Sequence, residues 1–215
     1  MPHKAPPNLR IAILVNTLQK KPQTGDSFVK IISAVAPESV VDFYDPVDDK
    51  SYPDVETYDL VILSGGTADI NAPDPWVLQE LEFIRTTVAS SNVKLVGICW
   101  GHQAINVALG GKLVVMEEGP EDIHEFHRRE ITEQAPGFVP LAHRNQIFKS
   151  PDNRILTFQG HPEMTAAIVQ AALAGSSEYT QRFSSKELEA ISKRVEGKQD
   201  GVAIFDRILR WVGEK

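Results

Sequence analysis

One stretch of the sequence has the residue types that a covalent acyl-transfer site requires. An apolar run leads into a Gly-x-Cys-x-Gly pattern formed by Gly97, Cys99 and Gly101. This pattern is typical of a nucleophile elbow, a sharp turn between a strand and a helix that exposes the nucleophile at a sheet edge. The helix that follows would point free N–H groups at the sulfur, which favours thiolate over thiol. Cys99 is therefore a candidate nucleophile; the alternative is a small buried core cysteine.

A thiolate nucleophile needs a base, and the base needs a group that orients it. The residues Gly160-His161-Pro162-Glu163 follow a strand-like run at 154–158. At the carboxyl end of that strand, His161 would lie at the same sheet edge as Cys99, where open α/β folds place their sites. Glu163 would hold the imidazole tautomer and stabilise the imidazolium. The alternative for Glu163 is a first-turn carboxylate of a helix that begins at Pro162.

The elements that must position these groups alternate along the chain. Apolar runs predict buried strands at residues 9–15, 39–44, 59–63, 94–99 and 154–158. Helical spacing predicts helices at residues 26–36, 103–109, 163–173, 184–195 and 200–212, and a capping carboxylate in Asp74-Pro75 predicts the start of another. This alternation favours an α/β fold with an open, mainly parallel sheet flanked by helices. Short strand-like pieces and turn residues at 112–160 predict a small β-rich insertion before the last strand.

Composition excludes several classes of partner. The chain has 215 residues with 22 Lys and Arg against 29 Asp and Glu, a formal net charge of −7. It lacks the basic run that nucleic acid or an anionic membrane requires, and no apolar run approaches the ~20 residues of a spanning helix. Cys99 is the only cysteine, which suits a reducing compartment and predicts a cytoplasmic location. With no linker in view, we expect one domain over 1–215, with an N-terminal arm at 1–8 and C-terminal helices at 176–215.

Three motifs together resemble those of the class I, triad-type glutamine amidotransferase family. They are Ser64-Gly65-Gly66-Thr67 after a strand, the stretch from Gly97 to Gln103, and the stretch from Gln159 to Glu163. The resemblance covers roughly residues 9–175 and is closest to standalone fungal and plant-type members, including γ-glutamyl peptidases. It implies a flavodoxin-like fold.

The family's roles carry over to matching positions of this chain. The resemblance implies a catalytic triad of Cys99, His161 and Glu163. It also implies an oxyanion hole from the backbone N–H groups of Gly66 and Trp100. Substrate contacts would come from Gly65, Thr67, Gln103 and His127.

The implied chemistry is acyl transfer from the side-chain amide of glutamine or from a γ-glutamyl compound. The sulfur would attack the amide carbon, and water would cleave the resulting thioester. No metal or organic cofactor is required. The resemblance covers no synthetase domain, so the ammonia would pass to a separate synthetase partner or leave as a product.

Two other hypotheses remain open. In one, the chain is an amidotransferase-like binding or regulatory protein. This hypothesis rests on a middle segment that is shorter than in the family, with only 62 positions between Cys99 and His161. In that segment Arg129 stands where the family usually has an acid. In the other, the chain is a different thiol enzyme on a flavodoxin-like sheet. Such enzymes usually place the histidine beside the cysteine, and His102 lies three positions after Cys99.

Overall fold

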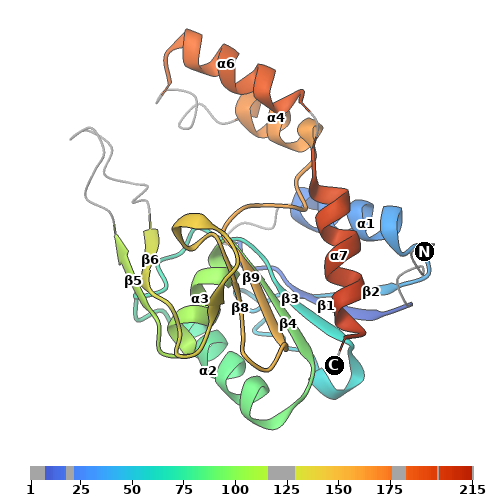
Figure 1. Ribbon diagram of the computed structural model, residues 1–215, viewed down its shortest axis with the longest axis vertical. Helices are drawn as coiled ribbons and strands as arrows, with labels where there is room; N and C mark the ends of the chain where they lie inside the picture. The colour runs from blue at the N-terminus through green and yellow to red at the C-terminus, as the bar shows by residue number, and fades with distance from the viewer. Residues whose placement is uncertain (1–7, 18–21, 116–128, 176–182, 198, 215) are drawn as a thin grey trace. The chain divides into compact units, whose positions relative to one another are not determined.

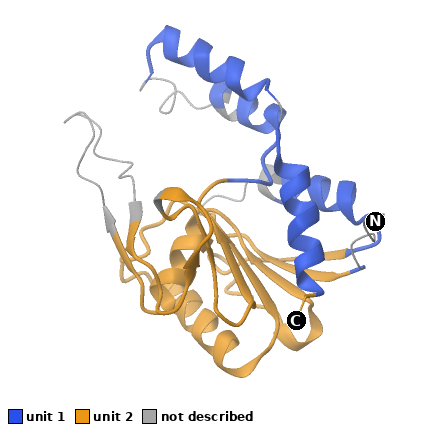
Figure 2. Ribbon diagram, in the orientation of Figure 1, with its two compact units in different colours: residues 1–8, 21–39, 161–213 blue, residues 9–20, 40–160, 214–215 orange. Residues whose placement is uncertain are grey.

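The apolar runs of the sequence form the parallel part of one seven-stranded sheet (Figure 1). The computed structural model describes residues 8–17, 22–115, 129–175, 183–197 and 199–214. The chain divides into two compact units: residues 1–8, 21–39 and 161–213 form unit 1, and the remainder forms unit 2 (Figure 2).

The sheet of unit 2 has the strand order β2-β1-β3-β4-β9-β8-β7. Its parallel strands are β1 (Arg10–Leu14), β2 (Val40–Tyr44), β3 (Leu60–Leu63), β4 (Lys94–Ile98) and β9 (Ile155–Phe158). Every residue of β3, β4 and β9 is buried, as expected for parallel strands covered on both faces. The register pairs Leu63 with Gly97 and Ile98 with Phe158, so the carboxyl ends of β3, β4 and β9 meet at one edge.

The predicted β-rich insertion is confirmed between β4 and β9. Two of its strands, β7 (Val139–Pro140) and β8 (Ile147–Lys149), run antiparallel and extend the main sheet beyond β9. The other two, β5 (Lys112–Val115) and β6 (Arg129–Glu133), form a separate two-stranded antiparallel sheet. Short 3-10 turns lie at Val55–Thr57 and His143–Asn145.

Helices α2 (Pro75–Ser90) and α3 (Trp100–Ala108) pack against each other, and α3 also contacts β3, β4 and β9. Helix α2 begins at Pro75 as predicted, but the Asp74 side chain makes no capping hydrogen bond, so that part of the prediction is wrong. Helix α3 begins directly after Cys99, three residues earlier than predicted. Beyond its end, Gly110 adopts a φ of 96°, which favours glycine.

Unit 1 contains four described helices. They are α1 (Pro22–Val35), α4 (Ala166–Gly175), α6 (Ser185–Val195) and α7 (Gly201–Val212). Helices α1 and α7 pack together through an edge-to-face contact of Phe28 with Phe205, whose ring centroids lie 6.2 Å apart. The capping box predicted for α6 forms between Ser184 and Glu187. No helix in the described parts of the chain is both long and apolar enough to cross a membrane.

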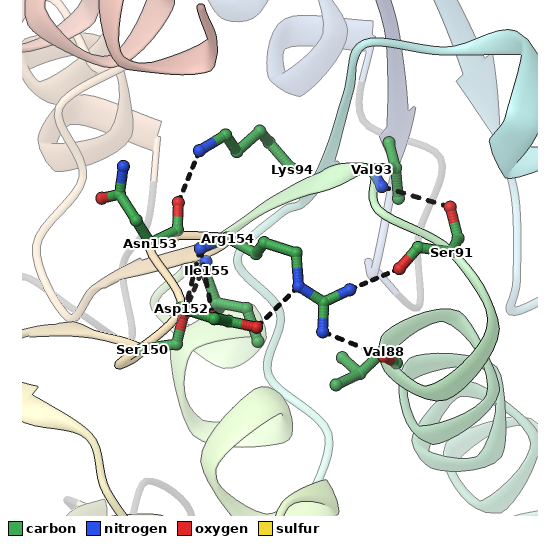
Figure 3. A network of polar contacts seen from close by, with 9 residues as sticks. All are labelled: Val88, Ser91, Val93, Lys94, Ser150, Asp152, Asn153, Arg154 and Ile155. Atoms are coloured by element: carbon green, nitrogen blue, oxygen red, sulfur yellow. Dashed lines mark hydrogen bonds and ion pairs between the residues drawn. The ribbon is translucent and has the colours of Figure 1, made fainter. Parts of the chain in front are cut away.

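Arg154 connects the segment before β9 to the C-terminal end of α2 (Figure 3). Its guanidinium donates to Asp152 Oδ2 at 2.6 Å, to the Val88 carbonyl at 3.1 Å, and to the Ser91 carbonyl. The last carbonyls of a helix lack partners within the helix and carry partial negative charge, so a cation stabilises them. This contact fixes α2 relative to β9 within unit 2.

Replacing Arg154 with alanine is expected to lower the free energy of unfolding by about 2 kcal/mol, because three charge-assisted hydrogen bonds are lost. Lysine should recover less than half of this loss, since one ammonium cannot reproduce the planar donor geometry. Urea denaturation measures both variants. The control is Lys112→Ala, which removes an ion pair between Lys112 and Glu133. These two side chains are 66% and 62% exposed, so the free energy of unfolding should change by less than ~0.5 kcal/mol. Equal effects of the two alanine variants would contradict this role.

Candidate active site

Cys99 occupies a sharp turn between β4 and α3. Its backbone has φ 52° and ψ −102°, in a region that residues with a side chain rarely adopt. The Cys99 N–H donates to the Phe158 carbonyl at 2.7 Å, and the Cys99 carbonyl accepts from the Gln103 N–H at 3.1 Å. The half-buried thiol therefore stands at the N-terminus of α3, beside the carboxyl end of β9.

The glycines on either side of Cys99 are required by close backbone approach. A Cβ on Gly97 would lie 2.5 Å from the Gly101 carbonyl oxygen, and one on Gly101 would lie 2.3 Å from the Leu63 carbonyl oxygen. The Gly101 N–H also donates to the Ser64 carbonyl at 3.2 Å. The start of α3 thus lies directly against the end of β3, which brings the first two sequence motifs together.

The two segments expected to supply oxyanion donors are neighbours. A Cβ on Gly66 would lie 3.3 Å from Cγ of Trp100. The Trp100 side chain is fully buried, stacks on Trp76 with ring centroids 5.2 Å apart, and donates through Nε1 to the Ala68 carbonyl at 3.1 Å. Trp100 therefore packs the turn that follows β3 against the start of α3.

The other predicted substrate contacts lie in different surroundings. Gln103 is buried, and its Nε2 donates to Oε1 of Gln159 at 2.9 Å, so it links α3 to the segment after β9. Gly65 is half-buried and Thr67 is exposed. His127 lies outside the described residues.

His161 and Glu163 form a close pair. Nδ1 of His161 lies 2.6 Å from Oε1 of Glu163, whose side chain is only 3% exposed, whereas His161 is half-buried. A bond at Nδ1 fixes the ring and assigns reaction chemistry to Nε2. Helix α4 begins only at Ala166, after a turn closed by the Met164 N–H and the His161 carbonyl, so the helix predicted from residue 163 starts too early. Glu163 is consequently not a first-turn carboxylate.

The turn that carries this pair rests on a residue that sequence reasoning missed. A Cβ on Gly201, the first residue of α7, would lie 2.3 Å from the Pro162 carbonyl oxygen. Only glycine allows α7 to pack this closely on the turn. Glycine is common at helix starts, so its presence at position 201 did not predict the contact with Pro162. Cys99 belongs to unit 2 and the His161–Glu163 pair to unit 1, so the triad stays a prediction.

His102, the alternative base, is an interior residue. Its ring is 1% exposed and stacks on Phe148 at an interplanar angle of 5° with centroids 5.5 Å apart. Burial lowers the pKa of His102 to about 4, against a smaller opposite effect of the Asn145 backbone. A neutral, stacked ring is typical of packing and gives no support to a thiol enzyme with adjacent cysteine and histidine.

Asn16 is a second residue that the sequence did not reveal. It follows β1 and is fully buried. Its N–H donates to Ser64 Oγ at 2.9 Å, and its Nδ2 donates to the Ser64 carbonyl at 3.3 Å. The sequence shows only a polar residue after an apolar run. Its role could not be predicted, because its hydrogen-bond partner Ser64 lies 48 positions away.

Comparisons with known proteins agree with this architecture. The family model for Glutamine amidotransferase class-I matches residues 29–135. The glutamine amidotransferase-like protein chyE of Penicillium rubens is 33% identical, with 96% of this chain and 98% of the relative covered. Gamma-glutamyl peptidase 4 of Arabidopsis thaliana is 27% identical over 54% of this chain and 58% of its own length. A crystal structure of a glutamine amido transferase from Methylobacillus flagellatus superposes with a TM-score of 0.66 at 18% identity, over 95% of this chain and 92% of that one.

Proposed function

Because the chain belongs to the class I glutamine amidotransferase family, we propose that it is a cysteine-dependent amidohydrolase. Its substrate is the side-chain amide of glutamine or of a γ-glutamyl compound. The observation that carries the proposal is the strained turn at Cys99, at the start of α3 and against the Ser64–Thr67 turn. A side chain held in a disfavoured backbone conformation at the edge of a parallel sheet is typical of a nucleophile.

The reaction proceeds in two steps. The Cys99 thiolate attacks the amide carbon, and the tetrahedral oxyanion accepts hydrogen bonds from the N–H groups of Gly66 and Trp100. As the C–N bond breaks, His161 gives its proton to the leaving ammonia or amine, and a γ-glutamyl thioester remains. His161 then takes a proton from water, whose oxygen attacks the thioester carbon and releases the acid and the thiolate. Glu163 stabilises the imidazolium that forms when His161 takes the thiol proton of Cys99, and again when it takes the proton of water.

Chain order supports the assignment of His161 as the base. The Phe158 carbonyl accepts a hydrogen bond from the Cys99 N–H, and His161 follows Phe158 by three residues. The buried carboxylate of Glu163 at 2.6 Å supports the orienting role that the mechanism requires. Gly65, Thr67, Gln103 and His127 are the proposed substrate contacts.

Two acceptors of the acyl-transfer products are consistent with the family. The likeness to a γ-glutamyl peptidase supports hydrolysis of γ-glutamyl compounds, with water as the acceptor. We place this reaction in the cytoplasm because the sequence has a single cysteine, which suits a reducing compartment. Glutamine hydrolysis would instead release ammonia to a separate synthetase partner. A panel of glutamine, γ-glutamyl dipeptides and glutathione-like compounds, assayed for released ammonia and amine, separates these two cases.

A glutamine-directed diazo-ketone is expected to label Cys99 with a stoichiometry of one, because the thiolate attacks the electrophile where it would attack the amide. Intact-mass measurement and peptide mapping identify the site. Cys99→Ala should take up no label while keeping its circular dichroism spectrum. A folded protein that neither reacts nor hydrolyses any member of the panel would favour an amidotransferase-like binding protein instead.

A further inference from the structure

Glu80 is a fully buried carboxyl that the proposed mechanism does not use. It lies on the inner side of α2, with 0% of its surface exposed. Among the residues that the structure describes, neither of its carboxyl oxygens has a hydrogen-bond partner. An ionised carboxylate in such a place is costly, whereas a protonated one can donate its own hydrogen bond. The arrangement therefore calls for an acceptor beside Glu80.

Asn16 carries an oxygen that can serve as this acceptor. Its amide approaches Glu80 closely enough to lower the pKa of the carboxyl, although burial dominates and raises that pKa from 4.5 to about 8. Oδ1 of Asn16 is also buried and lacks a partner among the described residues. When Glu80 is ionised, its two oxygens and Oδ1 of Asn16 can only accept hydrogen bonds, and none of the three has a partner among the described residues. A proton on Glu80 would supply the donor that these buried oxygens lack.

None of the groups that the structure describes near Glu80 offers it a positive charge. Burial raises the pKa of Tyr52, and the charge of an ionised Glu80 adds a smaller rise. The Tyr52 hydroxyl is buried and unpaired within the described residues, and its ring packs on Phe83. On α3, which packs against α2, the titratable side chain is the neutral His102, stacked on Phe148. On α2 itself, Glu82 and Arg85 form an exposed ion pair. A neutral Glu80 is the state that these surroundings favour.

Asn16 connects Glu80 to the turn that carries a proposed oxyanion donor. The backbone and side-chain nitrogens of Asn16 donate to the hydroxyl and carbonyl of Ser64. Its own carbonyl oxygen lies so close to Gly66 that a Cβ there would approach it to 2.1 Å. The direction in which the Gly66 N–H points thus depends on where Asn16 is held.

We propose that Glu80 is a positioning residue, which in its neutral form donates a hydrogen bond to Oδ1 of Asn16 and so holds the Ser64–Gly66 turn in the geometry that binds an oxyanion. This inference rests on the proposed function. Loss of the Glu80 proton removes the hydrogen-bond donor to Asn16. It also leaves a negative charge near the proposed oxyanion site, which must stabilise the negative charge of the tetrahedral intermediate. Glu80 therefore limits activity at alkaline pH.

The first test compares the pH dependence of kcat in the wild type and in Glu80→Gln, whose amide donates to Asn16 but does not titrate. In the wild type kcat should fall about tenfold per pH unit above pH ~8, and in Glu80→Gln this fall should be absent up to pH ~9.5. Glu82→Gln, an exposed change on the same helix, should keep the wild-type profile. An unchanged alkaline limb in Glu80→Gln would overturn the proposal.

The second test needs no activity and so separates this inference from the proposed function. The backbone amide resonance of Gly66 should titrate with an apparent pKa near 8 in the wild type and in Glu82→Gln, but stay fixed in Glu80→Gln. In parallel, the equilibrium constant for unfolding should be measured for the wild type and for Glu80→Gln. The ratio of the wild-type constant to that of Glu80→Gln should rise up to tenfold per pH unit from about pH 4.5 to 8, because Glu80 loses its proton at a lower pH in the unfolded state than in the folded state. A Gly66 resonance that does not move while this stability difference develops would overturn the positioning role. A protein that passes this test and hydrolyses no substrate would contradict only the proposed function.

Discussion

Replacing His161 with alanine is expected to lower kcat for γ-glutamyl hydrolysis by about 10³- to 10⁴-fold, with a much smaller change in KM. The imidazole is the proposed acid for the leaving amine and the base for water, and both roles act in the transition state rather than in substrate binding. Steady-state kinetics on the best substrate of the panel measure the effect. Glu163→Gln should lose most of the same activity, because the amide can no longer fix the tautomer or stabilise the imidazolium through the 2.6 Å contact.

The matched control for His161 is His143→Ala. His143 is an exposed histidine in the 3-10 turn at His143–Asn145, and it takes no part in the proposed reaction. Its replacement should change kcat by less than about twofold. A loss of less than tenfold in His161→Ala would contradict the catalytic triad, even if Cys99 proved to be the nucleophile.

Replacing Gly101 with alanine is expected to lower the free energy of unfolding by about 3 kcal/mol and kcat by about 100-fold. The added Cβ would lie 2.3 Å from the Leu63 carbonyl oxygen, so α3 and β3 must separate. Such a shift misplaces Cys99 against the Ser64–Thr67 turn, and displacements of about 1 Å cost catalysis about this much. Alanine ordinarily stabilises a helix by about 1 kcal/mol relative to glycine. A lower free energy of unfolding in Gly101→Ala would therefore be due to the close contact between α3 and β3 and not to helix propensity.

Gly160→Ala is the control for the glycine prediction, because a Cβ there would meet nothing within 4 Å. Its free energy of unfolding should stay within about 0.5 kcal/mol of the wild type. Urea denaturation and substrate turnover, measured on both variants, check the pair of expectations. Equal stability of Gly101→Ala and Gly160→Ala would show that the packing of α3 on β3 is looser than the structure indicates.

The parallel strands could be predicted from sequence because each is a continuous apolar run. Strand β3 was expected at residues 59–63 and lies at Leu60–Leu63, and β9 was expected at 154–158 and lies at Ile155–Phe158. The antiparallel direction of β7 and β8 could not be predicted, since strand direction depends on connections that a short apolar pattern does not encode. The starts of α3 and α4 were misplaced because turn residues set them, not hydrophobic spacing.

The site divides in the same way. Cys99 and the His161–Glu163 pair stand in motifs a few residues long, so their residue types and spacing were visible in the sequence. Asn16 and Glu80 were not, because each matters only through a partner distant along the chain. Ser64 is 48 positions from Asn16, and no local pattern joins Glu80 on α2 to the end of β1. Supporting groups of this kind become visible only when burial and unpaired atoms can be compared in three dimensions.

Strand β7 determines how the sheet ends on that side. It has two residues, and its pairing with β8 places Pro140 opposite Phe148. Proline has no backbone N–H, so this short outer strand offers almost no donors to which another chain could add. Self-association by continued strand addition is therefore blocked at this border, although Val139 and Leu141 expose apolar side chains there.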